Sequence, residues 1–279
     1  MPGEVAMAWP PGHFYSPVPS LDEVRAREDR VFAVPRSVPG VDLREDAQLA
    51  LVDELAPYCA DQPFTAERSP GLRYHFENPF FGAGDGIVLH CLLRHLRPPR
   101  VVEIGSGFSS ALMLDTDERF LGPRTSFTFV DPYPERLLEL LGDESGDRAE
   151  LIDRPVQDIA VDFFDQLRAG DVLFIDSTHV AKVGSDVNVL LLDVLPRLAP
   201  GVWVHVHDIL YPFEYPRDWI YGGRSWNEAY LLRAFLAFNT SFRIELFNSF
   251  LGHFHHRHVS QALPPWSRNT GGSIWLRRF

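Results

Sequence analysis

From residue 100 onward, short apolar segments rich in β-branched residues alternate with helical segments, and this alternation constrains the fold more than any other feature. We expect strands at residues 100–104, 126–130, 149–152, 172–175, 202–206, 242–247 and 273–276, with helices at 108–114, 135–141, 159–167, 187–198 and 226–238. Strands that are apolar along their whole length are typical of a parallel sheet covered by helices on both faces. The sequence therefore predicts an α/β fold with a doubly wound, mostly parallel seven-stranded sheet. No helix is expected between the last two strands, which indicates an antiparallel edge strand.

The first 80 residues have a different character. Residues 1–40 are rich in proline and suggest an extended arm, with one charged helix at about 21–30. A second helix is expected at 45–58 and a third at 86–96, where Pro98 and Pro99 end it. We therefore divide the chain into a proline-rich N-terminal extension with helices, 1–80, and a main domain, 81–279. The extension is expected to serve as a lid or as a contact in a homo-oligomer.

Composition excludes several classes of partner. The net charge of −12 argues against non-specific binding to nucleic acid or to an anionic membrane. No apolar run reaches the roughly 18 residues that a membrane-spanning helix needs. The N-terminus lacks the basic start and apolar stretch of a signal peptide, and the two cysteines, Cys59 and Cys91, cannot form a disulfide framework. We expect a cytoplasmic protein.

A glycine turn follows the first strand of the main domain. Gly105 permits a tight turn, and Gly107 is expected to let a ligand approach the backbone at the start of the next helix. Glu103 lies within the strand, and Ser110 occupies the third glycine position of the dinucleotide-binding fingerprint. An acid at Glu103 suits a ligand with an ammonium group and would repel a pyrophosphate. These two residues disfavour a nicotinamide oxidoreductase.

An acid, Asp131, ends the second strand and is followed by Pro132 and Tyr133. A carboxylate at this place can accept two hydrogen bonds from a ribose diol, and Tyr133 could lie against a purine. Taken alone, Asp131 and Pro132 could equally form the cap of the following helix. Their combination with Glu103 and the two glycines favours the ligand site.

These motifs resemble those of class I S-adenosylmethionine-dependent methyltransferases, and in particular bacterial small-molecule and sugar O-methyltransferases. The resemblance covers about residues 80–279 and extends to Phe174–Ser177, Leu198–Gly201 and Gly271–Leu276. It implies a Rossmann-like fold, with the methionine part of the cofactor at the glycine loop, the ribose at Asp131 and the adenine along residues 155–158. The cofactor contacts that it implies are Glu103, Gly105, Ser106, Gly107, Phe108, Ser109, Asp131, Pro132, Tyr133, Gln157 and Asp176.

Polar side chains also follow the fourth and fifth expected strands. Asp176 and His179 follow the fourth strand, and His207 and Asp208 follow the fifth. Because the carboxyl ends of parallel strands share one edge, these groups are expected to lie together. Related O-methyltransferases place metal ligands at such positions, which suggests Asp176, His207 and Asp208 as ligands of a divalent ion. Magnesium prefers oxygen, so a nitrogen ligand at His207 favours manganese, iron or zinc.

A version without metal stays open. In it, His179 or His207 takes the proton of an acceptor hydroxyl, with Asp176 nearby. The loop from Tyr211 to Trp226 could cover an acceptor, and its Arg224 could bind an acidic group. The histidine tract at 253–258 matches no closed zinc site, and a solvated loop is the favoured interpretation there.

The sequence thus predicts an S-adenosylmethionine-dependent methyltransferase that acts on a hydroxyl of a small molecule or sugar, with or without a divalent metal. An aminopropyltransferase-like enzyme is one alternative, because it would use a decarboxylated form of the same cofactor on the same fold. A cofactor-binding partner subunit without catalytic activity is the other. The sequence does not identify the methyl acceptor.

Overall fold

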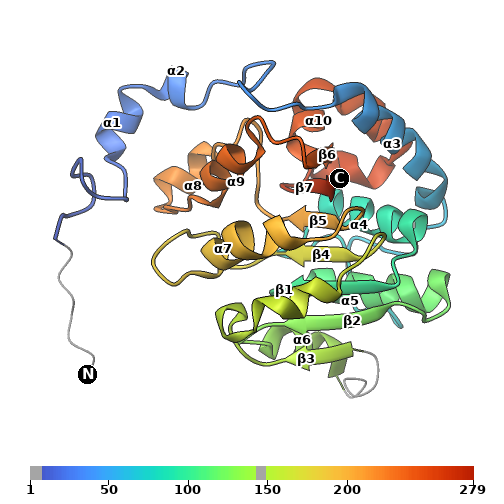
Figure 1. Cartoon of the computed structure of the whole chain (residues 1–279). Helices are drawn as coiled ribbons and strands as arrows, with labels where there is room; N and C mark the ends of the chain where they lie inside the picture. Colours follow the sequence, from blue (N-terminus) through green and yellow to red (C-terminus); the bar gives the residue numbers. More distant parts are fainter. Residues whose placement is uncertain (1–7, 143–148) are drawn as a thin grey trace.

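A computed structural model describes residues 8–142 and 149–279, and it confirms the predicted α/β fold. One seven-stranded sheet has the order β3-β2-β1-β4-β5-β7-β6 (Figure 1). The strands are β1 (Arg100–Ile104), β2 (Ser126–Val130), β3 (Ala149–Ile152), β4 (Val172–Ile175), β5 (Trp203–Val206), β6 (Phe242–Phe247) and β7 (Ile274–Arg278). The first five strands pair in parallel, and β7 enters between β5 and β6 antiparallel to both.

The register of the parallel strands places the site. Ile104 of β1 pairs with Val130 of β2 and with Ile175 of β4, and Ile175 in turn pairs with Val206 of β5. The four strands therefore end at the same level. Consequently, the residues that follow them all emerge at one edge of the sheet, where ligands bind in folds of this kind.

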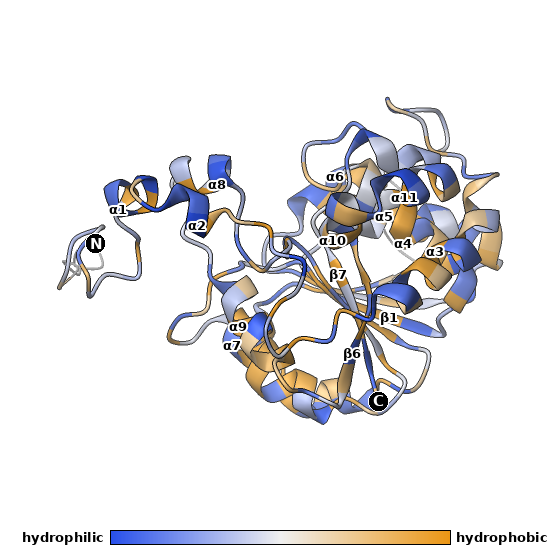
Figure 2. Cartoon of the chain, turned by 90° about the horizontal axis from the view of Figure 1, so that it is seen from above, coloured by the Kyte–Doolittle hydropathy of each residue, from blue (hydrophilic) through white to orange (hydrophobic). Residues whose placement is uncertain are grey.

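Helices cover both faces of the sheet, as the apolar strands require. The α-helices of the described part are α1 (Leu21–Arg25), α2 (Glu28–Val31), α3 (Glu45–Cys59), α4 (Ala83–Leu96), α5 (Phe108–Thr116), α6 (Glu135–Leu141), α7 (Asp186–Asn188), α8 (Arg217–Tyr221), α9 (Glu228–Leu236), α10 (Asn248–Phe254) and α11 (His256–Ala262). In Figure 2, α4, α5 and α6 lie on one side of the sheet, and α7 and α9 lie on the other. Within residues 8–142 and 149–279, no helix combines the length and apolar character that crossing a bilayer requires.

The N-terminal segment consists of two unlike parts. Helices α1 and α2 bury none of their residues and reach away from the body of the molecule (Figures 1 and 2). They contact the body of the molecule at α8, which contains Arg217 and Tyr221. Glu28 of α2 accepts a hydrogen bond from the Tyr221 hydroxyl and forms an ion pair of 3.2 Å with Arg217. Helix α3, in contrast, packs against α4 and β6 and buries Val52 and Leu55 completely.

Three segments differ from the helices and loops expected from sequence. The charged helix expected at 21–30 is divided into α1 and α2. Instead of an α-helix at 159–167, the chain forms the 3₁₀ segment η4 (Val161–Gln166), because the backbone is extended at Ile159 and Ala160 before it and at Leu167 after it. The helix expected at 187–198 continues from α7 through a π-helical segment, η5 (Val189–Val194), and a 3₁₀ turn, η6 (Leu195–Arg197).

The expectation of a solvated loop for the histidine tract is wrong. Helices α10 and α11 and the turn η7 (Pro264–Arg268) occupy this region, between β6 and β7. His255 Nε2 lies 2.5 Å from a carboxylate oxygen of Glu45, and His258 Nε2 lies 2.7 Å from one of Asp53. These histidines therefore attach α11 and its neighbour to the acidic face of α3, a partner that is remote in the sequence.

Candidate active site

A cavity of about 1150 Å³ opens along the carboxyl edge of the parallel strands. Its walls come from the residues after β1, β2, β3, β4 and β5, from the segment before α4, and from the loop between α8 and α9. The polar and aromatic residues that line it include Phe80, Ser106, Asp131, Tyr133, Arg136, Gln157, Asp176, Thr178, His179, Asp186, His207, Asp208, Trp219, Arg224 and Trp226. The edge predicted from sequence is thus the hollow edge of the structure.

The turn after β1 forms one end of this cavity. Gly105 has a φ of +86°, and a β-carbon there would lie 1.8 Å from the carbonyl oxygen of Asp176. The absence of a side chain at Gly105 therefore allows the turn to pack against the end of β4, and this close approach is to the protein itself and not to a ligand. The next residue, Ser106, faces the cavity and donates hydrogen bonds from its backbone N–H and its hydroxyl to Asp131, at 2.9 and 2.8 Å.

Asp131 is held in place by its neighbours in the chain and in the sheet. One carboxylate oxygen accepts both bonds from Ser106, and the other accepts the backbone N–H of Tyr133 at 2.8 Å. A carboxylate has about four acceptor positions. One position therefore remains for a ligand, and rotation of the Ser106 hydroxyl would release a second.

Glu103 lies behind this turn, and it does not line the cavity. Its side chain is completely buried and accepts hydrogen bonds from the hydroxyls of Ser109 and Ser110, the latter at 2.5 Å. Burial raises the pKa of Glu103 to about 8, although both serine hydrogen bonds oppose that shift. In this structure the carboxyl group secures the start of α5 to β1.

The other predicted cofactor contacts divide into two groups. Gly105, Ser106, Asp131, Pro132, Tyr133, Gln157 and Asp176 line the cavity, whereas Glu103, Gly107, Phe108 and Ser109 do not. A β-carbon on Gly107 would meet the side chain of Arg136 at 3.1 Å. The Arg136 guanidinium lies over the ring of Phe80, 3.6 Å from its centroid, and both side chains line the cavity. The segment before α4 that contains Phe80 was expected from sequence to close over the cofactor, whereas Arg136 was not anticipated.

The other end of the cavity holds His179 among three carboxylates. Its Nδ1 donates to Glu228 at 2.9 Å, and its Nε2 lies 3.5 Å from an oxygen of Asp176 and 3.6 Å from an oxygen of Asp208. His179 is nearly buried, whereas Asp176 and Asp208 are partly exposed to the cavity. The structure thus brings Asp176, His179 and Asp208 together as the strand ends predict.

The charges of this cluster reinforce one another. Burial disfavours the charged imidazolium, but the carboxylates of Asp176 and Glu228 raise the pKa of His179 to about 10. Burial likewise opposes ionisation of Asp176, but the charges on His207 and His179 lower its pKa to about 2. For Asp208 and Glu228, burial prevails and raises the pKa. His179 is therefore a strong proton acceptor in its neutral form, in a site where it is otherwise charged.

The backbone of this cluster is strained, which is a common property of functional sites. His179 and Asp208 both adopt left-handed conformations, with φ of 61° and 54°. The N-terminus of α9 holds the first of these turns, because the backbone N–H groups of Asn227 and Glu228 both donate to the His179 carbonyl. The Asn227 side chain adds two hydrogen bonds to the backbone of Ala181.

Glu228 was not anticipated from the sequence. It is completely buried at the first turn of α9, an ordinary place for an acid at a helix N-terminus. In the sequence, Glu228 is recognisable only as an acid directly before the apolar residues of an expected helix. Its contact with His179 joins residues that are 49 positions apart.

His207 and His205 project from β5 with their rings stacked, 5.6 Å apart. His207 lines the cavity, and its Nε2 lies 3.7 Å from Asp208. Burial opposes the charged form of His207, but Asp176 and Asp208 raise its pKa. His205 packs against Phe174 with ring centroids 3.7 Å apart, and burial lowers its pKa well below the ordinary value. His205 is therefore a neutral ring in the core.

The predicted metal site is not formed in this arrangement. Across residues 8–142 and 149–279, no group of three or more histidine, cysteine or acidic side chains is placed so that it could hold a metal ion. The imidazole of His179 lies between Asp176 and Asp208, with its Nε2 at 3.5 and 3.6 Å from their carboxylate oxygens. In the described residues, an imidazole therefore occupies the space between these two carboxylates.

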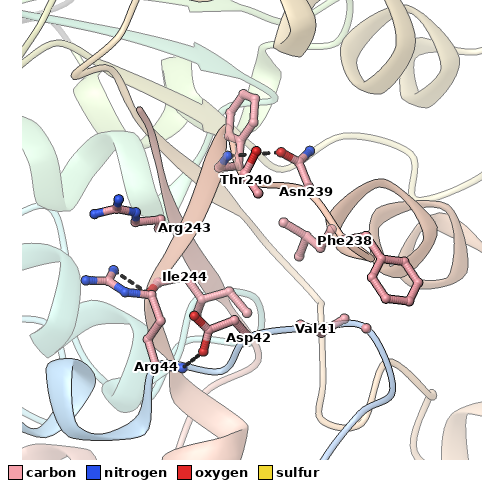
Figure 3. A pocket seen from close by; sticks show the side chains of 11 residues that line it. Val41, Asp42, Arg44, Phe238, Asn239, Thr240, Arg243 and Ile244 are labelled. Carbon is pink, nitrogen blue, oxygen red and sulfur yellow. Dashed lines mark hydrogen bonds between the residues drawn. The ribbon is translucent and has the colours of Figure 1, made fainter.

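A second, smaller cavity of about 410 Å³ lies at the β6 edge of the sheet. Figure 3 shows it between β6, which carries Arg243 and Ile244, and the segment that carries Val41, Asp42 and Arg44. Arg44 pairs with Glu245 at 2.9 Å and donates to the Ile244 carbonyl, so its charge is satisfied. None of the predicted site residues lines this cavity.

Comparison with known proteins identifies a family for part of the chain. A family model described as a methyltransferase domain matches residues 102–209, which span β1 to the end of the His207–Asp208 turn. An uncharacterised protein of Archaeoglobus fulgidus is 39% identical over 168 residues, which cover 59% of this chain and 76% of that protein.

Solved structures of methyltransferases are also similar in outline. The S-adenosylhomocysteine-bound methyltransferase PaMTH1 of Podospora anserina is 16% identical, with a TM-score of 0.44 over 93% of this chain and 95% of that one. The O-methyltransferase TomG of Streptomyces achromogenes, solved with S-adenosylmethionine, is 14% identical, with a TM-score of 0.46 over 93% and 96%. At these values neither structure carries an argument about activity. The family match, the sheet and the strand-end site support the assignment. Residues 102–209 of the chain therefore form a methyltransferase domain of the class I S-adenosylmethionine-dependent kind.

Proposed function

We propose that this protein transfers a methyl group from S-adenosylmethionine to a hydroxyl of a small molecule or sugar. The observation that carries the proposal is one continuous cavity with two chemically different ends. Asp131 and the glycine turn lie at one end, and the cluster of Asp176, His179 and Asp208 lies at the other. The first end suits a nucleoside, and the second suits proton removal from a hydroxyl.

The residues present fit the cofactor. The three hydrogen bonds that Asp131 accepts within the protein leave one acceptor position, which a ribose hydroxyl would fill. Tyr133, Val156 and Gln157 line the adjoining wall, where an adenine would lie. The carboxylates of Asp176 and Asp208 face the cavity from the other end, where they can interact with a cationic ligand. When bound, S-adenosylmethionine supplies a methyl group activated by its attachment to a positively charged sulfur.

In this proposal His179 acts as the general base. Glu228 accepts the proton on Nδ1 and so fixes the tautomer whose Nε2 lone pair faces the cavity. This arrangement resembles the acid–histidine pairs that orient a base in other enzymes. The neutral imidazole takes the hydroxyl proton at Nε2, and Asp176 and Asp208 stabilise the imidazolium that results. No step requires a metal ion.

The experiment is a transfer assay with methyl-labelled S-adenosylmethionine and a panel of hydroxylated acceptors, namely monosaccharides, catechol and their acids. We expect label in a methyl ether of at least one acceptor, and we expect exhaustive chelation to leave the rate unchanged. A rate abolished by chelator and restored by a divalent ion would reinstate the metal-assisted version.

Two alternatives are tested in the same assay. An aminopropyltransferase-like enzyme would consume decarboxylated S-adenosylmethionine with a polyamine acceptor, and the acids of the cavity leave this option open. A partner subunit without catalysis would bind S-adenosylhomocysteine but transfer no label to any acceptor. Transfer to a hydroxyl would exclude both.

A further inference from the structure

The loop between α8 and α9 brings a guanidinium to the wall of the cavity. The Arg224 guanidinium lies 4.3 Å from the ring centroid of Trp219 and 5.0 Å from that of Trp226. All three side chains line the cavity. Gly223, with a φ of +87°, and a hydrogen bond of 3.0 Å from the Arg224 backbone N–H to the Trp219 carbonyl fix the turn. The guanidinium is thus held by two indoles at a defined place.

Arg224 has no ion-pair partner among the residues that the structure describes. Within the described residues, 8–142 and 149–279, no carboxylate lies at ion-pair distance from it, whereas Arg217 on the adjoining helix pairs with Glu28. Stacking on the indole faces leaves the N–H groups at the edge of the guanidinium free to donate. An arginine with free donors beside a cavity suits a planar or tetrahedral anion.

Trp226 connects this cation to the reacting end of the site. Its ring centroid lies 4.5 Å from that of His179 and 5.0 Å from the Arg224 guanidinium, so a single indole spans the two groups. A molecule of about one ring could therefore reach both. At the other end, the imidazole of His179 already lies at ion-pair distance from Asp176 and Asp208, so an anionic group of the acceptor is favoured at Arg224 instead.

We propose that the acceptor is a single hydroxylated ring that carries a carboxylate or a phosphate, and that Arg224 binds this anionic group. The inference rests on the proposed function and specifies its substrate class. Trp219 and Trp226 pack against the ring, the anion is bound at Arg224, and the hydroxyl to be methylated is directed to His179. Arg224 is therefore a specificity-determining residue.

Calorimetry with matched pairs of acceptors tests this assignment. The protein is first saturated with S-adenosylhomocysteine and then titrated with glucuronate or glucose phosphate, each against glucose, and with protocatechuate against catechol. We expect at least one anionic compound to bind about ten- to a hundredfold more tightly than its neutral partner, as charge-assisted hydrogen bonds provide. The three pairs distinguish a sugar acid, a sugar phosphate and a phenolic acid as the source of the anion.

Three variants locate the effect. Arg224→Gln should remove the preference for the anion, and Arg224→Lys should retain part of it. Arg233→Gln, which changes an exposed arginine of α9 outside the cavity, should leave the preference unchanged. The assignment is overturned if no anion binds more tightly than its neutral partner, or if Arg224→Gln keeps the preference. The initial titration with S-adenosylhomocysteine alone tests the proposed function separately. Arg224→Gln should bind S-adenosylhomocysteine as tightly as the unchanged protein, because Arg224 is proposed to bind only the acceptor.

Discussion

The two ends of the cavity are built in different ways. At the cofactor end, Gly105, Ser106 and Asp131 follow two adjacent strands directly, and hydrogen bonds of 2.9 and 2.8 Å between Ser106 and Asp131 connect the two strand ends. At the acceptor end, His179 is hydrogen-bonded to Glu228. Glu228 lies at the start of α9, 49 residues later in the sequence. Local motifs thus specify the first end, whereas tertiary packing specifies the second. This difference predicts which substitutions affect binding of the cofactor and which affect transfer.

The largest effect is expected from His179→Gln, which removes the proposed base at the acceptor end. Methyl transfer should fall by about a hundred- to ten-thousandfold, the usual contribution of a general base. Binding of S-adenosylhomocysteine should stay nearly constant, since the ribose contacts lie at the other end. His256→Gln serves as the matched control, because that histidine is exposed on α11. Equal loss in rate and in cofactor affinity would show that the two ends are not separable.

At the cofactor end, Asp131→Ala should produce the opposite pattern. We expect affinity for S-adenosylhomocysteine to fall by about ten- to a hundredfold, because a hydrogen bond to a charged group contributes about 1.5 to 3 kcal/mol. The transfer rate at saturating cofactor should change little. Calorimetry and initial rates measure both, with Asp162→Ala as a control at an exposed acid outside the cavity. Unchanged affinity would remove Asp131 from the cofactor site.

A smaller and more specific effect is expected from Glu228→Gln. Transfer by unmodified enzyme should increase with pH toward the His179 pKa of about 10, because only the neutral imidazole accepts a proton. Glu228 raises that pKa, so its replacement should move the ascending limb of the pH–rate profile to lower pH by about one to two units. A rate that does not vary with pH would instead assign the hydroxyl proton to a carboxylate. A purely structural role for Glu228 would lower the rate without moving the limb.

The smallest effect on the site itself is expected from Glu103→Gln, which changes the support behind the cofactor end. The folded state holds the Glu103 proton up to a pKa of about 8, above the ordinary value of 4.5. This contribution to the free energy of unfolding is complete below the ordinary value and is lost as pH rises toward 8, with a slope of at most about 1.4 kcal/mol per pH unit.

Because glutamine keeps the polar contacts without a titrating proton, Glu103→Gln should lose this slope relative to the unchanged protein. Denaturant unfolding of both proteins across this pH range measures the difference. Parallel stability curves would show that the Glu103 carboxyl group titrates normally.

Sequence reasoning accounts for the sheet because strand composition and spacing carry that information locally. It also brings Asp131, Asp176, His179 and Asp208 to one edge, since parallel strands end together. It could not assign Glu103 to a buried contact with two serines, because the strand pattern does not show which way the carboxylate points.

Other features depended on contacts between remote segments. The pairing of α11 with the acids of α3 requires knowledge of which helices are neighbours, and a histidine-rich tract does not provide it. The aromatic wall at Trp219 and Trp226 belongs to a loop that was expected to cover the acceptor, but its distance from His179 follows only from the fold. The left-handed turns at His179 and Asp208 have no sequence signal, because neither residue is glycine.

The most direct test of the two-ended site is a crystal structure with S-adenosylhomocysteine bound. We expect the ribose hydroxyls to lie within hydrogen-bond distance of Asp131 and the sulfur to face Asp176 and His179 across the cavity. We further expect His179 to remain paired with Glu228, with its Nε2 facing the cavity. A ligand bound outside this cavity, or a ribose that makes no contact with Asp131, would contradict the account.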